Sequence, residues 1–526
     1  EKILAEDFSK KINENNPEQL DNVKSRIYYF KEFMYNIDKA EIVEMTNPNT
    51  KLKSHHLILQ SVDNQYLQLG IAKGEVLDYF ETFIVRKNDD YFHDTTIIEA
   101  VTGIYRYDDE CNLIPFSFDP VKAEKLEKEY CLKLKDKELL TFIFSIEKGE
   151  DGEAYNFFLK DINEKNQKLF PLNLEINSSG IQKWIETRKA PKNRVLMDKV
   201  FEKIAKNKKN VMDYIDVSFG LSLNDCYWII PSDKKDEYKW EKYNLYKNKF
   251  SEVIGNIAFT GYGEKITGIT TSPELTTNGM LKKCWHIENG KIYLYKGSTP
   301  EFANQGKEAY SEFYSSQVAK IFFENIKSEK KLFPISYELR EFHNQIVSAC
   351  ELFTTEDKGY IPIEMLLRSK GLALKSLDSK IIVEIKKIYG KEKFEDLMIF
   401  DAIIGNTDRH LGNFGMFIDN NTNKILETAP IFDNGLSFLN HLTLEEIKDK
   451  NYIKEYNNNG FRTNRFNQTF EEVVRLYISD RHLESLEKLK NFKLKKDKNY
   501  NLAQDWLDGF ENNIKENAKN FLKILK

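Results

Sequence analysis

A loop and the hairpin that follows it, within residues 400–438, constrain this chain more than any other segment. Asp408 and Asn413 share the stretch TDRHLGN, and Asp433 comes after a segment in which Phe414, Met416 and Ile418 alternate and asparagines supply a turn. This pattern predicts a β-hairpin that returns Asp433 to the side of the loop. An aspartate that orients a hydroxyl group, together with an asparagine and a second aspartate that bind Mg²⁺, is what phosphoryl transfer requires.

Each of these residues has a simpler explanation when it is taken alone. Aspartate and asparagine favour caps and turns in all folds, so Asp408 or Asn413 could merely end an element. The set Asp408, His410, Asn413 and Asp433, with a hairpin of suitable length inside it, favours a functional site. Asparagine suits a hard cation because its amide oxygen coordinates the metal without adding a full charge.

TDRHLGN followed by PIFDNGLS resembles the HipA-like serine/threonine protein kinases, which share the order Asp-x-His-x-x-Asn with phosphoinositide-type lipid kinases. The resemblance covers about residues 181–526 and is strongest in 400–438. It implies an ATP- and Mg²⁺-dependent enzyme that phosphorylates a protein Ser or Thr hydroxyl. It also implies the roles of four residues: catalysis by Asp408, nucleotide contact by His410, and Mg²⁺ binding by Asn413 and Asp433.

Residues upstream match the phosphate loop of the same family. In SPELTTNGMLKKCW, Thr276, Gly279 and Lys283 fit the family pattern Ser-x-x-Gly-x-x-x-Lys, and Thr277 stands beside them. A glycine here would let backbone amides approach a phosphate. Relatives can autophosphorylate the loop serine, and threonine at this position leaves that regulation open. The more glycine-rich stretch TGYGEKITG, residues 260–268, is expected to be a strand end and turn instead.

The remaining nucleotide-binding residues are expected on a strand, a helix and a hinge. Lys296 lies on the inward face of a predicted strand, where a cation needs a negative partner, although an edge strand could also end there. Glu312 in the next helix matches the family's partner for that lysine. Glu308 is the rival, since an acidic residue in a first helical turn favours the helix dipole. Glu351 and Phe353 match the family's adenine-binding hinge, but a plain buried strand fits that segment equally well.

The length of the chain predicts two or three folding units. Residues 1–175 are expected to form an additional α+β domain with an accessory or recognition role, beginning with an amphipathic helix near residues 18–37. Residues 181–350 would hold a helical segment and a kinase N-lobe, and residues 351–526 a mainly helical C-lobe. The expected fold class is therefore α+β: a bilobal protein-kinase-like fold with a mixed β N-lobe, preceded by a further domain.

Composition sets limits on partners and location. The formal net charge of −5 gives no broad electrostatic reason to bind nucleic acid or a membrane surface. The five cysteines form no Cys-x-x-Cys pair, which disfavours zinc and disulfides and fits a reducing compartment. No apolar run reaches the roughly 18 residues of a membrane span. We therefore expect a cytoplasmic protein with a protein substrate and, from the resemblance, an antitoxin or regulatory partner.

Two other functional classes stay open at this point. A lipid or small-molecule kinase could carry the same catalytic-loop order, and a non-catalytic nucleotide-binding regulator could retain these residues. The resemblance also admits the toxin of a toxin–antitoxin system or a phage-defence component. Within the loop itself, Arg409 could pair either with a substrate or with a structural carboxylate such as Asp401.

Overall fold

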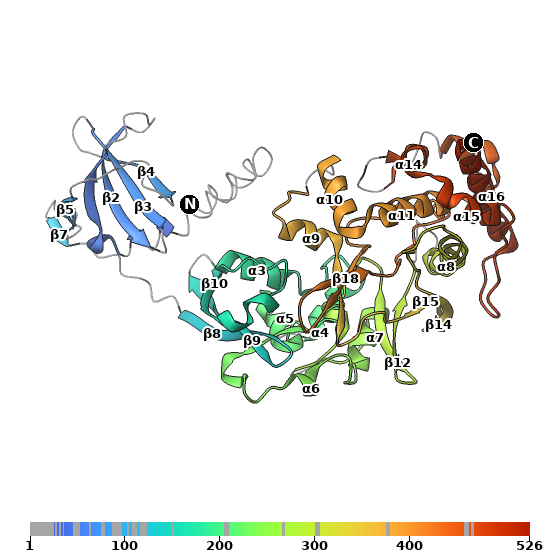
Figure 1. Cartoon of the computed structure of the whole chain (residues 1–526). Helices are drawn as coiled ribbons and strands as arrows, with labels where there is room; N and C mark the ends of the chain where they lie inside the picture. Colours follow the sequence, from blue (N-terminus) through green and yellow to red (C-terminus); the bar gives the residue numbers. More distant parts are fainter. Residues whose placement is uncertain are drawn as a thin grey trace. The chain divides into compact units, whose positions relative to one another are not determined.

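The structure is a computed structural model in which contacts between residues divide the chain into two units (Figure 1). One unit comprises Glu1–Leu126 and Ile146–Ala154, and the other Glu127–Ser145 and Tyr155–Lys526. The structure describes residues 26, 29–30, 33–34, 36–45, 53–62, 65–74, 79–86, 97–101, 105–107, 113–115, 124–149, 152–204, 210–265, 269–299, 306–374, 379–456, 462–463, 466 and 468–525.

The first unit is built around a five-stranded antiparallel sheet in the order β4-β3-β2-β1-β5. Its strands are β1 (Glu41–Glu44), β2 (Ser54–Val62), β3 (Gln65–Ala72), β4 (Tyr79–Arg86) and β5 (Ile97–Ala100), and a separate pair joins β6 (Tyr105–Tyr107) to β7 (Leu113–Pro115). Leu67 and Leu69 alternate inward on β3 and pack with Phe33 and Ile37, so one face of the sheet is covered. Most of the helix predicted near residues 18–37 lies outside the described residues.

The second unit begins with a four-stranded sheet in the order β10-β9-β8-β11. The strands are β8 (Glu124–Leu134), β9 (Lys137–Gly149), β10 (Gly152–Ile162) and β11 (Tyr227–Pro231). Four helices follow or flank them: α3 (Ser178–Glu186), α4 (Met197–Ile204), α5 (Met212–Ser218) and α6 (Trp240–Tyr243). β8 pairs with β11, and residues 127–145 and 155–175 belong to this unit. The division into three domains proposed from the sequence stays a prediction.

A second sheet carries the residues expected to bind a nucleotide. Its antiparallel order is β12-β13-β15-β14, formed by β12 (Lys283–Glu288), β13 (Lys291–Lys296), β15 (Gln345–Glu351) and β14 (Glu338–Phe342). Two helices contact it, α7 (Glu252–Thr260) and α8 (Glu308–Glu324). The prediction that a strand ends at residue 260 is wrong. Residue 260 is the last residue of helix α7, which Ser251 caps at its start and Gly261 ends in the left-handed conformation with φ 79°.

The remainder is a three-stranded sheet and a group of helices, which appear together in yellow to red in Figure 1. The strands β16 (Lys358–Pro362), β17 (Gly415–Asp419) and β18 (Ile425–Thr428) confirm the predicted hairpin. The helices are α9 (Ile363–Ser369), α10 (Ser379–Tyr389), α11 (Lys391–Ile404), α12 (Leu444–Lys448), α13 (Lys450–Glu455), α14 (Phe470–Tyr477), α15 (Leu483–Leu489) and α16 (Gln504–Leu525), with a short pair β19 (Arg462–Thr463) and β20 (Gln468–Thr469).

Helix α11 is the centre of this helical part, because nearly all of its length is buried against α10, α14 and α16. Its burial fixes the position of the loop that follows Ile404. The amphipathic helices at the end of the chain appear where the sequence predicts them. In the part of the chain that the structure describes, no helix is both long and apolar enough to cross a membrane.

Candidate functional site

Lys296 stands at the end of β13 with its ammonium group between two carboxylates. Its Nζ donates to Glu312 Oε1 at 2.5 Å and to Asp433 Oδ1 at 2.5 Å. Glu312 lies in α8 and is 1% exposed, and Asp433 follows the hairpin with φ 59°. The ion pair predicted between Lys296 and Glu312 is therefore present. Glu308, the other candidate partner for Lys296, is the first residue of α8. Its carboxylate instead accepts a hydrogen bond from the backbone N–H of Thr299.

The charges of this group depend on one another. Burial alone would lower the pKa of Lys296, but the carboxylates of Asp433 and Glu312 outweigh it and raise that pKa. Burial would likewise raise the pKa of Asp433, yet the ammonium groups of Lys296 and Lys283 hold it well below its usual range. For Glu312 burial dominates and raises the pKa. Lys296 and Asp433 consequently carry opposite charges across the neutral pH range.

The loop after α11 is organised by Arg409, which is fully buried. Its guanidinium donates to Asp401 from Nε at 3.0 Å and from Nη2 at 3.0 Å. Nη1 donates to the carbonyl oxygens of Asn413 at 3.1 Å and Phe432 at 2.7 Å, and Nη2 also reaches Asn434 at 2.5 Å. Of the two partners considered for Arg409, the structure shows the structural carboxylate. This one side chain joins the loop to α11 and to the segment that carries Asp433.

Asp408, His410 and Asn413 occupy the same turn of that loop. The side-chain amide of Asn413 donates to the Asp408 carbonyl at 3.1 Å, and His410 Nδ1 accepts from the backbone of Gly412 at 3.0 Å. Burial, and then the negative charge of Asp433, raise the pKa of Asp408. The Asp408 and Asp433 carboxylates thus lie close enough for the charge of one to shift the pKa of the other. His410 stabilises the loop through its hydrogen bond with Gly412.

The threonines of the candidate phosphate loop, residues 272–285, are held by backbone carbonyls. Thr276 is buried, and its hydroxyl donates to the Leu221 carbonyl at 2.6 Å. The Thr277 hydroxyl donates to the Pro273 carbonyl at 2.6 Å and accepts from Trp285 Nε1 at 2.9 Å. In this conformation neither hydroxyl is free to accept a phosphoryl group.

Gly279 and Lys283 complete the candidate phosphate loop and contact each other. Gly279 has φ 98°, a conformation that side chains rarely adopt, and a Cβ placed on it would lie 2.3 Å from Lys283 Nζ. Lys283 is buried and donates to the Asn278 carbonyl at 2.7 Å. Burial, and then the charge of Lys296, lower the pKa of Lys283 to about 7. A second lysine thus lies between the loop and Lys296.

The two hinge residues predicted from the sequence differ in their surroundings. Glu351 ends β15 at the surface, where it pairs with Lys291 at 2.7 Å. Phe353 packs edge-on to Tyr360 at 5.7 Å and tilted to Phe432 at 5.4 Å, directly before Asp433. The adenine-binding role of Glu351 and Phe353 stays a prediction, and the ring of Phe353 packs beside the residue that precedes Asp433.

The oxygen atoms of the site suit a hard cation that takes only one or two ligands from the protein and the others from water or a nucleotide. Among the described residues, no group of three or more His, Cys, Asp or Glu side chains could hold a metal ion. Asn413 and Asp433 supply an amide oxygen and a carboxylate. Mg²⁺ commonly binds through one or two such protein groups and takes its remaining ligands from water and substrate phosphates. The residues present therefore fit Mg²⁺ bound together with a nucleotide.

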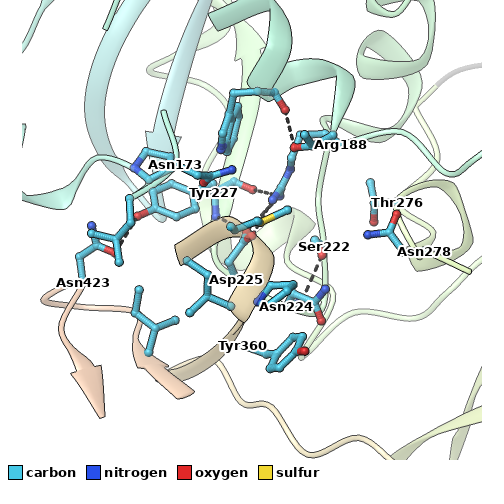
Figure 2. A pocket seen from close by; sticks show the side chains of 18 residues that line it. Asn173, Arg188, Ser222, Asn224, Asp225, Tyr227, Thr276, Asn278, Tyr360 and Asn423 are labelled. Atoms are coloured by element: carbon cyan, nitrogen blue, oxygen red, sulfur yellow. Dashed lines mark hydrogen bonds and ion pairs between the residues drawn. The ribbon is translucent and has the colours of Figure 1, made fainter. Parts of the chain in front are cut away.

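A separate cavity of about 70 Å³ lies beside this cluster in the second unit (Figure 2). Thr276 and Asn278 of the candidate phosphate loop form part of its wall, and Tyr360 and Pro362 of β16 form another part. Arg188, Asn224 and Asp225 also line it. Sequence reasoning missed this cavity, because its walls come from segments far apart in the chain.

Comparison with known proteins gives different results for the two ends of the chain. Residues 1–123 match a protein-family model, PBECR4, described as phage-Barnase-EndoU-ColicinE5/D-RelE like nuclease4. The curated serine/threonine-protein kinase CtkA of Helicobacter pylori (strain J99 / ATCC 700824) is 28% identical over 163 residues, which are 28% of this chain and 47% of CtkA. The kinase-like part of this chain resembles the HipA-like serine/threonine kinases, as its motifs predict. The chain spans about half the length of this curated relative.

Two solved structures show a weaker likeness to the kinase-like chain. The Helicobacter pylori proinflammatory kinase CtkA gives a TM-score of 0.39 at 16% identity, covering 47% of this chain and 91% of that one. HipA of Shewanella oneidensis MR-1, in a complex of a toxin–antitoxin system with HipB and operator DNA, gives 0.42 at 11% identity, covering 75% and 97%.

Proposed function

We propose that the kinase-like part of the chain transfers the γ-phosphoryl group of ATP to a Ser or Thr hydroxyl of a protein. The observation that carries this proposal is the contact of Lys296 with both Glu312 and Asp433. It joins a strand, a helix and the segment after the hairpin at one point, beside the loop of Asp408. The same proposal includes a bilobal kinase arrangement. The sheet of β12, β13, β14 and β15 would belong to the N-lobe, and the helices that follow would form the C-lobe.

Each side chain has a role in the proposed transfer. Asp408 orients the acceptor hydroxyl and takes its proton, for which a raised pKa is favourable. Lys296 places a fixed positive charge at the phosphates, and Lys283 adds a second one below about pH 7. Asn413 and Asp433 would hold Mg²⁺, which neutralises phosphate charge when it is bound. Arg409 positions the loop and contacts no reacting atom in this scheme.

The first experiment incubates the protein with Mg²⁺ and γ-labelled ATP, with and without cell extract. Wild type should transfer label to protein, and Asp408→Asn and Asp433→Asn should each lose most of it. Asp419→Asn is the matched control, because Asp419 lies in the same hairpin and accepts backbone hydrogen bonds that asparagine can also accept. Equal labelling by all four proteins would refute the assignment.

The acceptor class separates the proposal from its rivals. Extraction of the same reaction into an organic phase would recover label if the acceptor were a lipid, and low-molecular-mass products would indicate a small-molecule kinase. Nucleotide binding without any labelled product would indicate a regulator. The toxin role and the antitoxin partner rest on the resemblance alone, and co-expression with genetically adjacent proteins tests both.

A second function is favoured for the first unit by its match to a nuclease-like family model. We propose that this unit cleaves nucleic acid. His56 of β2 is paired in register with Glu44 of β1, and Glu44 is exposed while His56 is partly exposed, so an imidazole and a carboxylate lie side by side on the sheet. Labelled RNA and DNA strands should be cut by wild type and spared by His56→Gln. The control His343→Gln, in the other unit, should cut normally.

A further inference from the structure

The cavity shown in Figure 2 takes no part in the phosphoryl-transfer chemistry described above. The residues of its wall indicate which kind of ligand it binds. It lies within the second unit, and the polar residues of its wall include Asn173, Arg188, Asn224, Asp225, Thr276 and Asn278. Lys296, Asp408 and Asp433 do not line it. The role that we infer for this cavity deepens the proposed kinase function and rests on it.

The cavity presents no free charge. Arg188 is the one cation among the described residues that line it. Arg188 donates to both carboxylate oxygens of Asp225, at 2.5 Å and 2.9 Å, and to the carbonyls of Gly220 and Tyr227. Arg188 and Asp225 therefore neutralise each other within the wall. No lysine stands among the lining residues that the structure describes. A phosphate or carboxylate would find no unpaired cation there, so the cavity suits a neutral ligand.

The polar groups that remain are side-chain amides. Asn173 and Asn224, which are half-buried, and Asn278, which is exposed, line the cavity, and no described residue forms a hydrogen bond with their side-chain amides. The hydroxyl groups of Thr276 and Thr187 are already committed to backbone carbonyls. Each asparagine amide offers donors and an acceptor together. This combination matches a group that also has both, such as a peptide unit.

The aromatic residues do not form a slot for a nucleobase. Trp184 and Tyr227 meet edge to face, with an interplanar angle of 87° at 6.0 Å. The guanidinium of Arg188 lies over the Trp184 ring at 5.0 Å. Stacking of a base between two rings would need parallel faces, and none of these pairs provides them. A main-chain ligand fits the cavity better than a base.

The cavity adjoins both loops of the proposed active site. The Thr276 hydroxyl bonds to Leu221, whose loop continues into Asn224. The Asn224 carbonyl accepts from the backbone of Tyr360 at 2.7 Å. The Tyr360 hydroxyl in turn donates to the Gly412 carbonyl, between His410 and Asn413, at 3.1 Å. A ligand here would lie next to the phosphate loop and one hydrogen bond from the catalytic loop.

We propose that this cavity binds the main chain of an extended, uncharged segment of the polypeptide substrate. The asparagine amides pair with its peptide groups, and the segment leads the acceptor hydroxyl toward Asp408. Because side chains of the substrate are not recognised by charge here, the cavity favours neutral residues beside the phosphorylated one. Acidic or phosphorylated segments bind it poorly.

The test uses acetylated and amidated peptides of glycine, alanine and one serine, and the same peptides N-methylated at the residues flanking the serine. N-methylation removes the N–H donors without adding charge. The full-length protein is compared with Asn224→Leu, Asn173→Leu and the control Asn520→Leu, an exposed asparagine on α16. Peptide binding is measured by equilibrium dialysis without nucleotide, and KM for peptide and for ATP are measured by label transfer.

We expect each cavity variant, and each N-methylated peptide, to weaken peptide binding and raise KM for peptide about threefold to tenfold, as the loss of one or two hydrogen bonds implies. KM for ATP should stay unchanged, and Asn520→Leu should resemble wild type. A change in KM for ATP alone would assign the cavity to the nucleotide and overturn the proposal. Equal binding of methylated and unmethylated peptides would overturn it as well. Failure of wild type to transfer label would refute the kinase function, while dialysis would still decide the subsite.

Discussion

Replacement of Lys296 by methionine should reveal how strongly the two carboxylates depend on it. The Lys296 ammonium contacts Glu312 and Asp433 at 2.5 Å each, and Glu312 is 1% exposed. Methionine has nearly the same length but no charge. The variant therefore leaves a buried carboxylate without its cation while it keeps the packing of the strand.

The magnitude follows from the burial of the pair. Removing one partner of a buried ion pair costs about 3–5 kcal/mol of unfolding free energy, because the other charge remains desolvated. Glu312 can relieve this cost by taking up a proton, and its pKa is already raised by burial. The folded state of the variant then binds more protons than the unfolded state. Its stability should fall by about 1.4 kcal/mol for each pH unit between the ordinary pKa of the glutamate and the raised one.

Urea unfolding at pH 5 and pH 8, followed by tryptophan fluorescence, measures both effects. The loss caused by Lys296→Met should be larger at pH 8 than at pH 5. The control Lys291→Met changes the same residue type on the same strand, but its partner Glu351 is exposed, so the midpoint should not move. A loss of stability that is equal at the two pH values, or absent, would refute the argument that Lys296 neutralises a buried carboxylate.

Three other contacts can each be tested with one substitution. Arg409→Met should lower the unfolding free energy by about 3–5 kcal/mol, measured by urea unfolding, whereas Arg475→Met in an exposed helix pair should not. Gly279→Ala and Gly290→Ala both place alanine at positive φ, and each should lower the unfolding free energy by about 1–2 kcal/mol. Only the alanine at position 279 would contact Lys283, so only Gly279→Ala should also raise KM for ATP. Burial lowers the pKa of Lys283 to about 7 in the folded state, whereas an unfolded lysine keeps its proton up to about pH 10.4, so between these pH values the unfolded state binds more protons. Wild type should therefore gain stability from pH 7 to pH 9, and by more than Lys283→Met does in parallel melts.

The sequence was sufficient where local spacing determines the structure. The alternation of apolar residues around asparagines fixes a hairpin, so the return of Asp433 beside the loop could be predicted. A lysine on the inward face of a strand needs a negative partner, and the resemblance to the HipA-like kinases pointed to Glu312 rather than Glu308 of the next helix. The helical tail was predictable from its period.

The sequence was insufficient where distant segments meet. Arg409 is central because Asp401, Asn413 and Phe432 converge on it, and no local pattern distinguishes that role from substrate binding. Residues 252–260 read EVIGNIAFT, a mostly apolar segment interrupted by Asn256, and so short a segment fits a strand or a buried helix. The Ser251 cap at its start indicates the helix. The cavity beside the site likewise exists only after tertiary packing brings its walls together.

The measurement that tests the central claim most directly is the identity of the labelled amino acid after reaction with Mg²⁺ and γ-labelled ATP. Acid hydrolysis of the protein products should release labelled phosphoserine or phosphothreonine from the wild-type reaction and from Asp419→Asn, and almost none from Asp408→Asn. Absence of both labelled amino acids from the wild-type reaction, or equal amounts from wild type and Asp408→Asn, would contradict the assignment of this site to protein phosphorylation.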